Sequence, residues 1–258
     1  MKKTEEETFI NEFAIRSFRD VGDFDYVAAR MAYRAKLYPQ FLWSGQQTIE
    51  KYLKCVLLLN RIKAPKIGHN LSKSLKLVEQ HLSFKFRLSD ESRKTIEYFD
   101  TYGLSRYFET PYHVNGEYLI DFDRAIWELR RYCRTINYDY TSPDGTKKSV
   151  LNHELMIIEK SEKLPPQSFK RINGKLEELI ADKKHPAREF VIWKNQYFGT
   201  QIRKTIKIRK FSYSANSPLS LTPEILDNIQ QYVHLSKEVV KGYKQVLHDR
   251  TKQNNRVG

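Results

Sequence analysis

Residues 39–65, PQFLWSGQQTIEKYLKCVLLLNRIKAP, carry the pattern that most constrains the fold. Apolar side chains recur there every three or four positions, the spacing that places them on one face of an α-helix. That face comprises Phe41, Leu42, Ile49, Leu53, Val56, Leu57 and Leu58. Glu50, Lys51 and Lys54 fall on the opposite side, and Pro65 ends the pattern. The segment therefore predicts a long helix that packs one broad face against other helices.

Four further segments show helical spacing, at about 23–37, 70–82, 89–103 and 117–136. Asn70 or Ser72 can cap the second of these and Ser89 or Asp90 the third, because such side chains accept hydrogen bonds from the free N–H groups of a first helical turn. Gly103 fits the end of the third. Together these segments predict an all-α fold.

Residues 139–148, DYTSPDGTKK, contain Ser-Pro and Asp-Gly turn signals and are the best candidate for a boundary. We expect a leading segment at 1–20, a helical bundle at 21–140 and a helical C-terminal extension at 149–258, whose independence the sequence leaves open. Helical stretches within the extension are predicted near 151–162, 167–182, 186–205 and 223–249. Thr222 would cap the last of them, and residues 206–213 alternate enough to allow a short strand.

The chain is strongly basic, with 45 Lys and Arg against 31 Asp and Glu and a formal net charge of +14. Such an excess favours an anionic partner such as nucleic acid, since binding releases counterions from the phosphates. A basic surface without any such partner remains the alternative. The N-terminal residues lack the apolar stretch of a secretory signal, and the longest apolar run, Cys55 to Leu59, is too short for a bilayer. We therefore expect a soluble, cytoplasmic protein that does not enter a membrane.

Familiar metal and nucleotide motifs are missing from the sequence. Cys55 and Cys133 cannot build a disulfide framework or a four-ligand zinc site, so buried free thiols are expected. His153-Glu154 lacks the second histidine of a zinc-protease helix, and there is neither a glycine-rich phosphate loop nor a Gly-x-Ser-x-Gly element. We expect no metal and no cofactor.

The loop at 104–116, LSRYFETPYHVNG, lies between two predicted helices and holds Arg106 and His113. An arginine near a histidine can stabilise a phosphate and move a proton, which is what metal-free RNA cleavage requires. The alternative is that both are ordinary loop residues. His69, just before another helix, is expected to hydrogen-bond a helix end rather than to act in function.

Residues 185–199, HPAREFVIWKNQYFG, interleave aromatic and cationic side chains, which can clamp single-stranded nucleic acid. At this spacing Phe190, Trp193 and Tyr197 more often form one buried helix face, and we favour that alternative. The next segment, QIRKTIKIRK at 201–210, carries five basic residues and no acidic one.

Three elements in this order resemble the HEPN family (higher eukaryotes and prokaryotes nucleotide-binding). They are DYVAARMAYRAKLYPQFLWSGQQTIEKYLKCVLLL with its Glu50-Lys51-Tyr52-Leu53-Lys54 element, then GHNLSKSLKLVEQ, then RYFETPYH. The resemblance covers roughly residues 20–140. It implies an up-and-down bundle of four or five helices that forms a homodimer in which the loops of two chains meet.

Active family members carry an Arg-x4–6-His motif and cleave RNA without a metal. The resemblance therefore implies that Arg106 holds the scissile phosphate and His113 transfers protons, with Tyr107 and Tyr112 lining the site. It further implies RNA as substrate, a role in toxin–antitoxin or antiviral defence, and a possible antitoxin or nucleotidyltransferase partner. The alternatives are a non-catalytic HEPN module that binds nucleotides, RNA or a partner protein, and a helical adaptor.

Arg130, Arg131 and Arg134 form a run of cations at the end of the helix predicted at 117–136. We expect them to make a basic outer stripe that contacts RNA. A solvated helix face without a ligand is the alternative.

Overall fold

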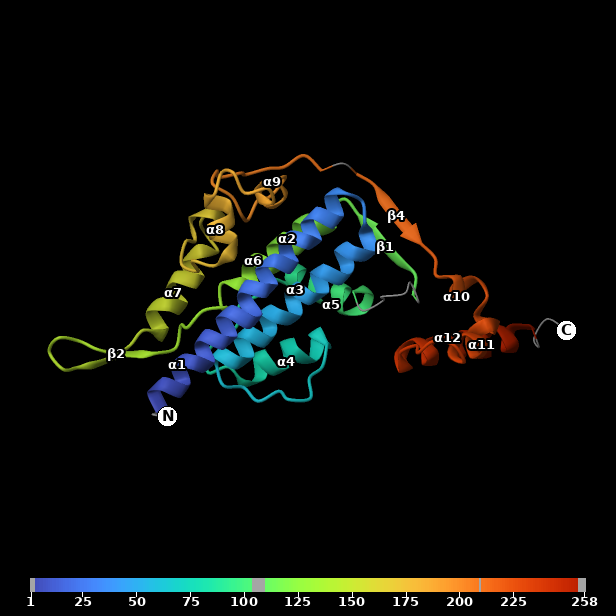
Figure 1. The fold of residues 1–258 in the computed structure, drawn as a ribbon, viewed down its shortest axis with the longest axis horizontal. Helices are drawn as coiled ribbons and strands as arrows, with labels where there is room; N and C mark the ends of the chain where they lie inside the picture. Colours follow the sequence, from blue (N-terminus) through green and yellow to red (C-terminus); the bar gives the residue numbers. More distant parts are fainter. Residues whose placement is uncertain (1–2, 104–109, 209, 255–258) are drawn as a thin grey trace.

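The computed structural model describes residues 3–103, 110–208 and 210–254, and Figure 1 shows their arrangement. The described chain is predominantly helical, which confirms the predicted all-α class. The bundle comprises α1 (Lys3–Phe13), the π-helical segment η1 (Ala14–Arg19), α2 (Asp20–Arg34), α3 (Tyr38–Leu59), α4 (Leu71–His81), α5 (Asp90–Tyr102) and α6 (Tyr118–Arg130). Helix α3 lies centrally and packs against α2, α4, α5 and α6.

The starts of α4 and α5 follow the capping residues that the sequence predicted. The Asn70 side chain accepts the N–H of Lys73 at 2.6 Å, and the Ser89 hydroxyl accepts the N–H of Ser92 at 3.2 Å. Gly103 ends α5 with an ordinary φ of −77°. It is a glycine for packing reasons, because a Cβ there would lie 2.3 Å from the Cβ of Gln46.

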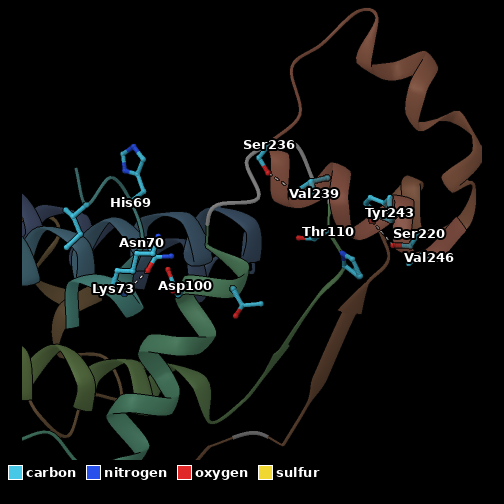
Figure 2. A pocket seen from close by; sticks show the side chains of 14 residues that line it. His69, Asn70, Lys73, Asp100, Thr110, Ser220, Ser236, Val239, Tyr243 and Val246 are labelled. Carbon is cyan, nitrogen blue, oxygen red and sulfur yellow. Dashed lines mark hydrogen bonds between the residues drawn. The ribbon is translucent and has the colours of Figure 1, made fainter. Parts of the chain in front are cut away.

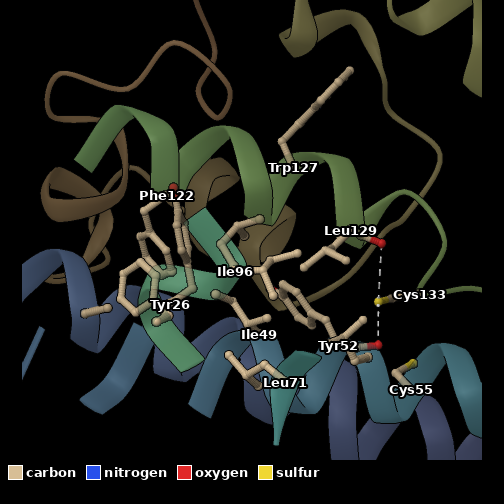
Figure 3. Packing of buried hydrophobic residues seen from close by; sticks show 14 of the residues in the cluster. Tyr26, Ile49, Tyr52, Cys55, Leu71, Ile96, Phe122, Trp127, Leu129 and Cys133 are labelled. Carbon is tan, nitrogen blue, oxygen red and sulfur yellow. Dashed lines mark hydrogen bonds between the residues drawn. The ribbon is translucent and has the colours of Figure 1, made fainter. Parts of the chain in front are cut away.

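The main core is a cluster of buried apolar side chains from α3 and from the helices packed around it (Figure 3). Phe41 contacts Phe99 and Phe122 edge-to-face, with ring centroids 5.4 and 5.6 Å apart, and Tyr26 lies 5.6 Å from Phe122. Cys55 and Cys133 are buried and free, as predicted. The prediction for Glu50 was wrong: it is only 4% exposed, on the inner side of α3.

The turn signals predicted in residues 139–148 fall in a hairpin of β2 (Asp139–Thr141) and β3 (Lys147–Ser149). The helices that follow are α7 (Leu151–Ser161), the 3-10 turn η2 (Pro166–Ser168), α8 (Lys175–Ala181) and α9 (Arg188–Ile192). The helices predicted at 167–182 and 186–205 are therefore much shorter. Asn173 and Lys194 adopt left-handed φ angles of 51° and 45°, which no helix continues through.

Residues 150–200 share the main core, because Ile158, Leu176 and Val191 belong to the same buried cluster as the bundle. The last part of the chain has a small core of its own, made of Leu219, Leu226, Leu235 and Tyr243. It consists of α10 (Pro218–Leu221), η3 (Pro223–Ile225), α11 (Leu226–Gln230) and α12 (Lys237–Asn254), so the single helix predicted at 223–249 is broken at 231–236. Thr222 stands at the predicted N-cap position, directly before Pro223, but its side chain makes no capping hydrogen bond.

A two-stranded ribbon joins the C-terminal helices to the bundle. Strand β1 (Tyr112–Asn115), within the loop that carries His113, pairs antiparallel with β4 (Ser212–Ala215). The sequence allowed a strand near β4 but gave no sign of β1. No helix in the described ranges combines the length and apolar character needed to cross a membrane.

Candidate functional site

Of the two residues expected to carry catalysis, the structure describes His113 alone. Arg106 and Tyr107 belong to residues 104–109 and lie outside the described part of the chain. His113 is half-buried on β1, directly opposite Ser214 of β4. Tyr112, its neighbour, points to the other face of the ribbon, where its ring lies 6.2 Å from that of Tyr213. The structure therefore does not bring Tyr112 and His113 together on one face.

Three tyrosines surround the His113 imidazole. The ring centroids of Tyr118, Tyr102 and Tyr98 lie 5.5, 5.7 and 5.8 Å from that of His113. Nε2 of His113 lies 2.5 Å from the Tyr118 hydroxyl, and the Tyr98 hydroxyl donates to the His113 carbonyl oxygen, also at 2.5 Å. These contacts fix both the ring and the backbone of His113.

Tyr118 lies close to His113 because the side chain of Asn115, the last residue of β1, binds the backbone at the start of α6. The Asn115 side-chain oxygen accepts the N–H groups of Glu117 and Tyr118, at 2.9 and 3.1 Å. This Asx turn sets the first turn of α6 directly behind the strand. The sequence analysis missed Tyr118, although its place five residues after His113, at the start of a predicted helix, was visible in the sequence.

Burial, reinforced by Tyr102, raises the pKa of Tyr118, and burial likewise raises that of Tyr98. Both therefore stay protonated across the physiological range. A phenol can accept as well as donate, so the Tyr118 hydroxyl can accept a hydrogen bond from Nε2–H of His113. In that tautomer Nδ1 carries the lone pair and can take up a proton. The pair is thus suited to general acid–base chemistry.

A second polar cluster lies where α3 meets the start of α4. The buried carboxylate of Glu50 accepts from Lys54 at 2.6 Å, from Gln46 at 3.2 Å and lies 3.0 Å from Nδ1 of His69. Burial alone would raise the pKa of Glu50, but the hydrogen bonds from Lys54 and His69 bring it below its ordinary value. His69 thus contacts a carboxylate on α3, not a helix end as predicted.

His69 also borders a cleft of about 910 Å³ between the bundle and the C-terminal helices (Figure 2). Lys73 and Asp100 line its bundle side, and Val239 and Tyr243 of α12 line the opposite side. Thr110, the first described residue after the loop that holds Arg106, lies at its edge. Asp100 is already engaged, because its carboxylate accepts the N–H groups of Leu71 and Ser72 at the start of α4.

The predicted basic outer stripe was wrong. Arg130 and Arg131 are 0% and 1% exposed, and the side chain of Arg134 is 11% exposed. Arg130 forms ion pairs with Asp23 and Glu177, and Arg134 forms an ion pair with Glu154 at 2.6 Å.

Arg131 lies over the Trp127 ring at 4.3 Å and donates to the Ile158 carbonyl at 3.2 Å. Carboxylates, carbonyls and rings from distant parts of the chain thus hold these guanidinium groups in the interior. They are out of reach of RNA in this structure.

Residues 16–133 match the HEPN domain family. This match spans the bundle from η1 through the turn after α6, and it includes the loop and His113. This part of the chain is therefore a HEPN domain, as the sequence resemblance implied. No curated protein and no solved structure is a significant match to the chain.

Proposed function

We propose that the chain is a metal-independent endoribonuclease in which His113 transfers protons and Arg106 holds the scissile phosphate. The observation that carries this proposal is the imidazole of His113, held at Nε2 by Tyr118, within a HEPN domain. HEPN domains often cleave RNA or bind nucleotides, and often act as dimers. The excess of cations over anions suits a polyanionic substrate.

The proposed reaction uses the substrate's own 2′-hydroxyl. A base removes its proton, the 2′-oxygen attacks the adjacent phosphorus, and an acid protonates the departing 5′-oxygen, which leaves a 2′,3′-cyclic phosphate and a 5′-hydroxyl. One imidazole cannot readily serve as both base and acid in the same step. Two copies of His113, one from each chain of a homodimer, can divide these roles.

Two copies of Arg106 would neutralise the charge that builds up on the phosphorane, with each well-aimed donor contributing about 3–4 kcal/mol. Such an activity suits a toxin or an antiviral defence effector that acts on cytoplasmic RNA. An antitoxin or a nucleotidyltransferase-type partner would then hold it in check.

The test is to incubate purified protein with total RNA in EDTA and to identify the ends of the fragments. We expect 2′,3′-cyclic phosphate ends, and we expect Arg106→Ala and His113→Ala to abolish cleavage without loss of RNA binding. His153→Ala, a change at an exposed histidine on α7, is the matched control and should cleave normally. Cleavage that survives both site changes would refute the proposed roles.

The second candidate function is a non-catalytic HEPN module that binds a nucleotide, RNA or a partner protein. The 910 Å³ cleft beside Thr110 favours it, because clefts of this size with a few polar groups are typical of ligand sites. Intact RNA in the EDTA assay, together with saturable binding of a nucleotide that Lys73→Gln, a change at an exposed residue of the cleft lining, weakens, would support this alternative over the ribonuclease.

A further inference from the structure

The segment between α9 and β4 passes the C-terminal end of α2 (Figure 1). The residues of these two parts of the chain line a cleft of about 600 Å³. Its walls come from three separated stretches of the chain: the end of α2 with the turn after it, Trp193 and Lys194 after α9, and a third stretch made of Ile206, Ile208 and residues 210–213. The start of α6 closes its base. The HEPN match at 16–133 leaves two of these three stretches outside the domain.

Four cations line this cleft: Arg34, Lys36, Lys194 and Lys210. None of the lining residues that the structure describes is acidic, and Glu189, 3.8 Å from Arg34, is an exposed neighbour outside the lining. The side chains of Lys36 and Lys210 are exposed, and that of Lys194 is half-buried. Such a cluster creates a positive potential that attracts phosphates.

Aromatic side chains lie between these cations. Arg34 stacks 5.3 Å from the Trp193 ring on one side of the cleft, and Lys194 lies 5.3 Å from the same ring. On the other side, Tyr213 is 45% exposed and its ring lies 5.0 Å from that of Tyr38. Aromatic rings beside cations are the arrangement with which proteins hold single-stranded nucleic acid, because bases stack on accessible rings such as that of Tyr213 while the cations pair with the backbone.

Two of the lysines are held in an unusual backbone conformation. Lys36 and Lys194 have φ angles of 62° and 45°, in the left-handed region that L-residues rarely adopt. Each sits in a tight turn that follows a helix, so both side chains emerge at the cleft. Backbone strain of this kind often accompanies binding sites.

The cleft is connected to the strand that carries His113. Tyr213 belongs to β4, opposite Val114 of β1, and its ring lies 6.2 Å from that of Tyr112. We propose that this cleft binds single-stranded RNA and leads it onto the face of the β1–β4 ribbon that carries Tyr112 and Tyr213. The choice of RNA over DNA rests on the proposed ribonuclease function, whereas the charge and the stacking surface do not.

Charge removal tests the proposal by fluorescence anisotropy. The probe is a labelled oligouridylate with methylated 2′-hydroxyls, which the enzyme cannot cleave. Substituting Lys36, Lys194 and Lys210 together by Gln should weaken binding at least about tenfold at low salt, and should lower the slope of log K against log salt by about 2, since each single-strand phosphate contact contributes about 0.7.

The matched control removes the same charge elsewhere, by substituting Lys147, Lys148 and Lys163, all exposed and remote from the cleft lining, by Gln. It should retain most of the affinity. Equal losses in the two triple variants would overturn the cleft as the binding site, and so would a wild-type protein that does not bind the probe.

A conservative pair of variants tests stacking. Tyr213→Leu should weaken binding roughly tenfold, while Tyr213→Phe, which keeps the ring, should bind like the wild type. If both bind alike, stacking on Tyr213 is excluded. Polyglutamate is also tested as a competitor of the labelled oligouridylate. If it competes as well as polyuridylate does, and if Tyr213→Leu binds polyglutamate as the wild type does, the cleft is a site for acidic protein and the RNA proposal is overturned.

Binding and cleavage fail separately in these experiments. A wild-type protein that binds the probe through the cleft but leaves total RNA intact would refute the ribonuclease and keep the cleft. Normal RNA cleavage by the wild type, together with an unchanged RNA affinity in the triple lysine variant, would refute the cleft as the binding site and keep the ribonuclease.

Discussion

The buried Arg130 network yields the sharpest prediction about stability. The guanidinium of Arg130 is fully buried and bidentate to Asp23, with both N–O distances 2.7 Å. It also reaches both oxygens of Glu177, at 2.6 and 2.7 Å. Tyr52 and the N–H of Leu176 complete the shell of Asp23, at 2.6 and 3.1 Å.

Arg130→Met keeps most of the side-chain volume but leaves the Asp23 carboxylate buried without a counter-charge. Breaking a buried pair in this way costs about 3–5 kcal/mol, since the remaining ion is not hydrated. With a slope of about 3 kcal/mol per molar urea, the unfolding midpoint should fall by about 1–2 M. Urea titration followed by tryptophan fluorescence measures the shift, because Trp127 lies in the same core.

Arg16→Met is the control, because it breaks an exposed pair with Glu12 and should leave the midpoint unchanged. Adding Asp23→Asn to Arg130→Met removes the stranded charge and should restore part of the loss. A midpoint for Arg130→Met equal to that of the wild type would refute the view that this arginine is a structural ion in the core.

Three further predictions concern packing, pH and the site. Gly103→Ala forces a Cβ to within 2.3 Å of a glutamine on α3 and should cost about 1–3 kcal/mol by urea titration, whereas Gly242→Ala, whose Cβ meets nothing within 4 Å, should not destabilise; equal effects would contradict the packing argument. The pKa of Glu50 is lowered in the folded state, so its contribution to stability is full above its ordinary pKa of 4.5 and is lost as the pH falls through the lowered value. The stability gap between wild type and Glu50→Gln should therefore shrink on acidification, and a constant gap would contradict this. Tyr118→Phe removes the hydroxyl that holds Nε2 of His113 and should slow RNA cleavage about tenfold without changing RNA affinity; an unchanged rate would show that the contact does not position the imidazole.

The helices of the bundle could be predicted because their information is local. The apolar face of α3 repeats within the segment itself, and the caps Asn70 and Ser89 stand one residue before the helices they start. The HEPN resemblance rests on the order of these same segments. What a helix needs in order to form is thus mostly contained in its own residues.

The predictions failed where contacts with residues far away in the chain determine burial or secondary structure. Arg130 has the sequence pattern of a surface cation, and its partner Asp23 lies 107 positions away in the chain. Glu50 was placed outside for the same reason, although a histidine 19 positions away helps to hold it inside. Strand β1 exists through pairing with β4, about a hundred residues later, and no local pattern announces such a pairing.

The candidate site contains one residue that the local sequence could indicate and others whose placement depends on the folded structure. His113 could be chosen from its spacing to an arginine in the loop, whereas its partner Tyr118 depends on the turn that Asn115 makes in three dimensions. Tyr112 was expected beside His113, but the alternation of a strand sends neighbouring side chains to opposite faces. The two faces can be assigned only once it is known that a strand forms there, and the sequence did not indicate one.

The most direct test of the account is the single-turnover rate of RNA cleavage by His113→Ala in EDTA, measured beside the wild type and His153→Ala. If the imidazole held by Tyr118 moves the proton, the rate should fall by at least about 10²-fold while His153→Ala keeps the full rate. A His113→Ala protein that cleaves as fast as the wild type would contradict the account at its centre.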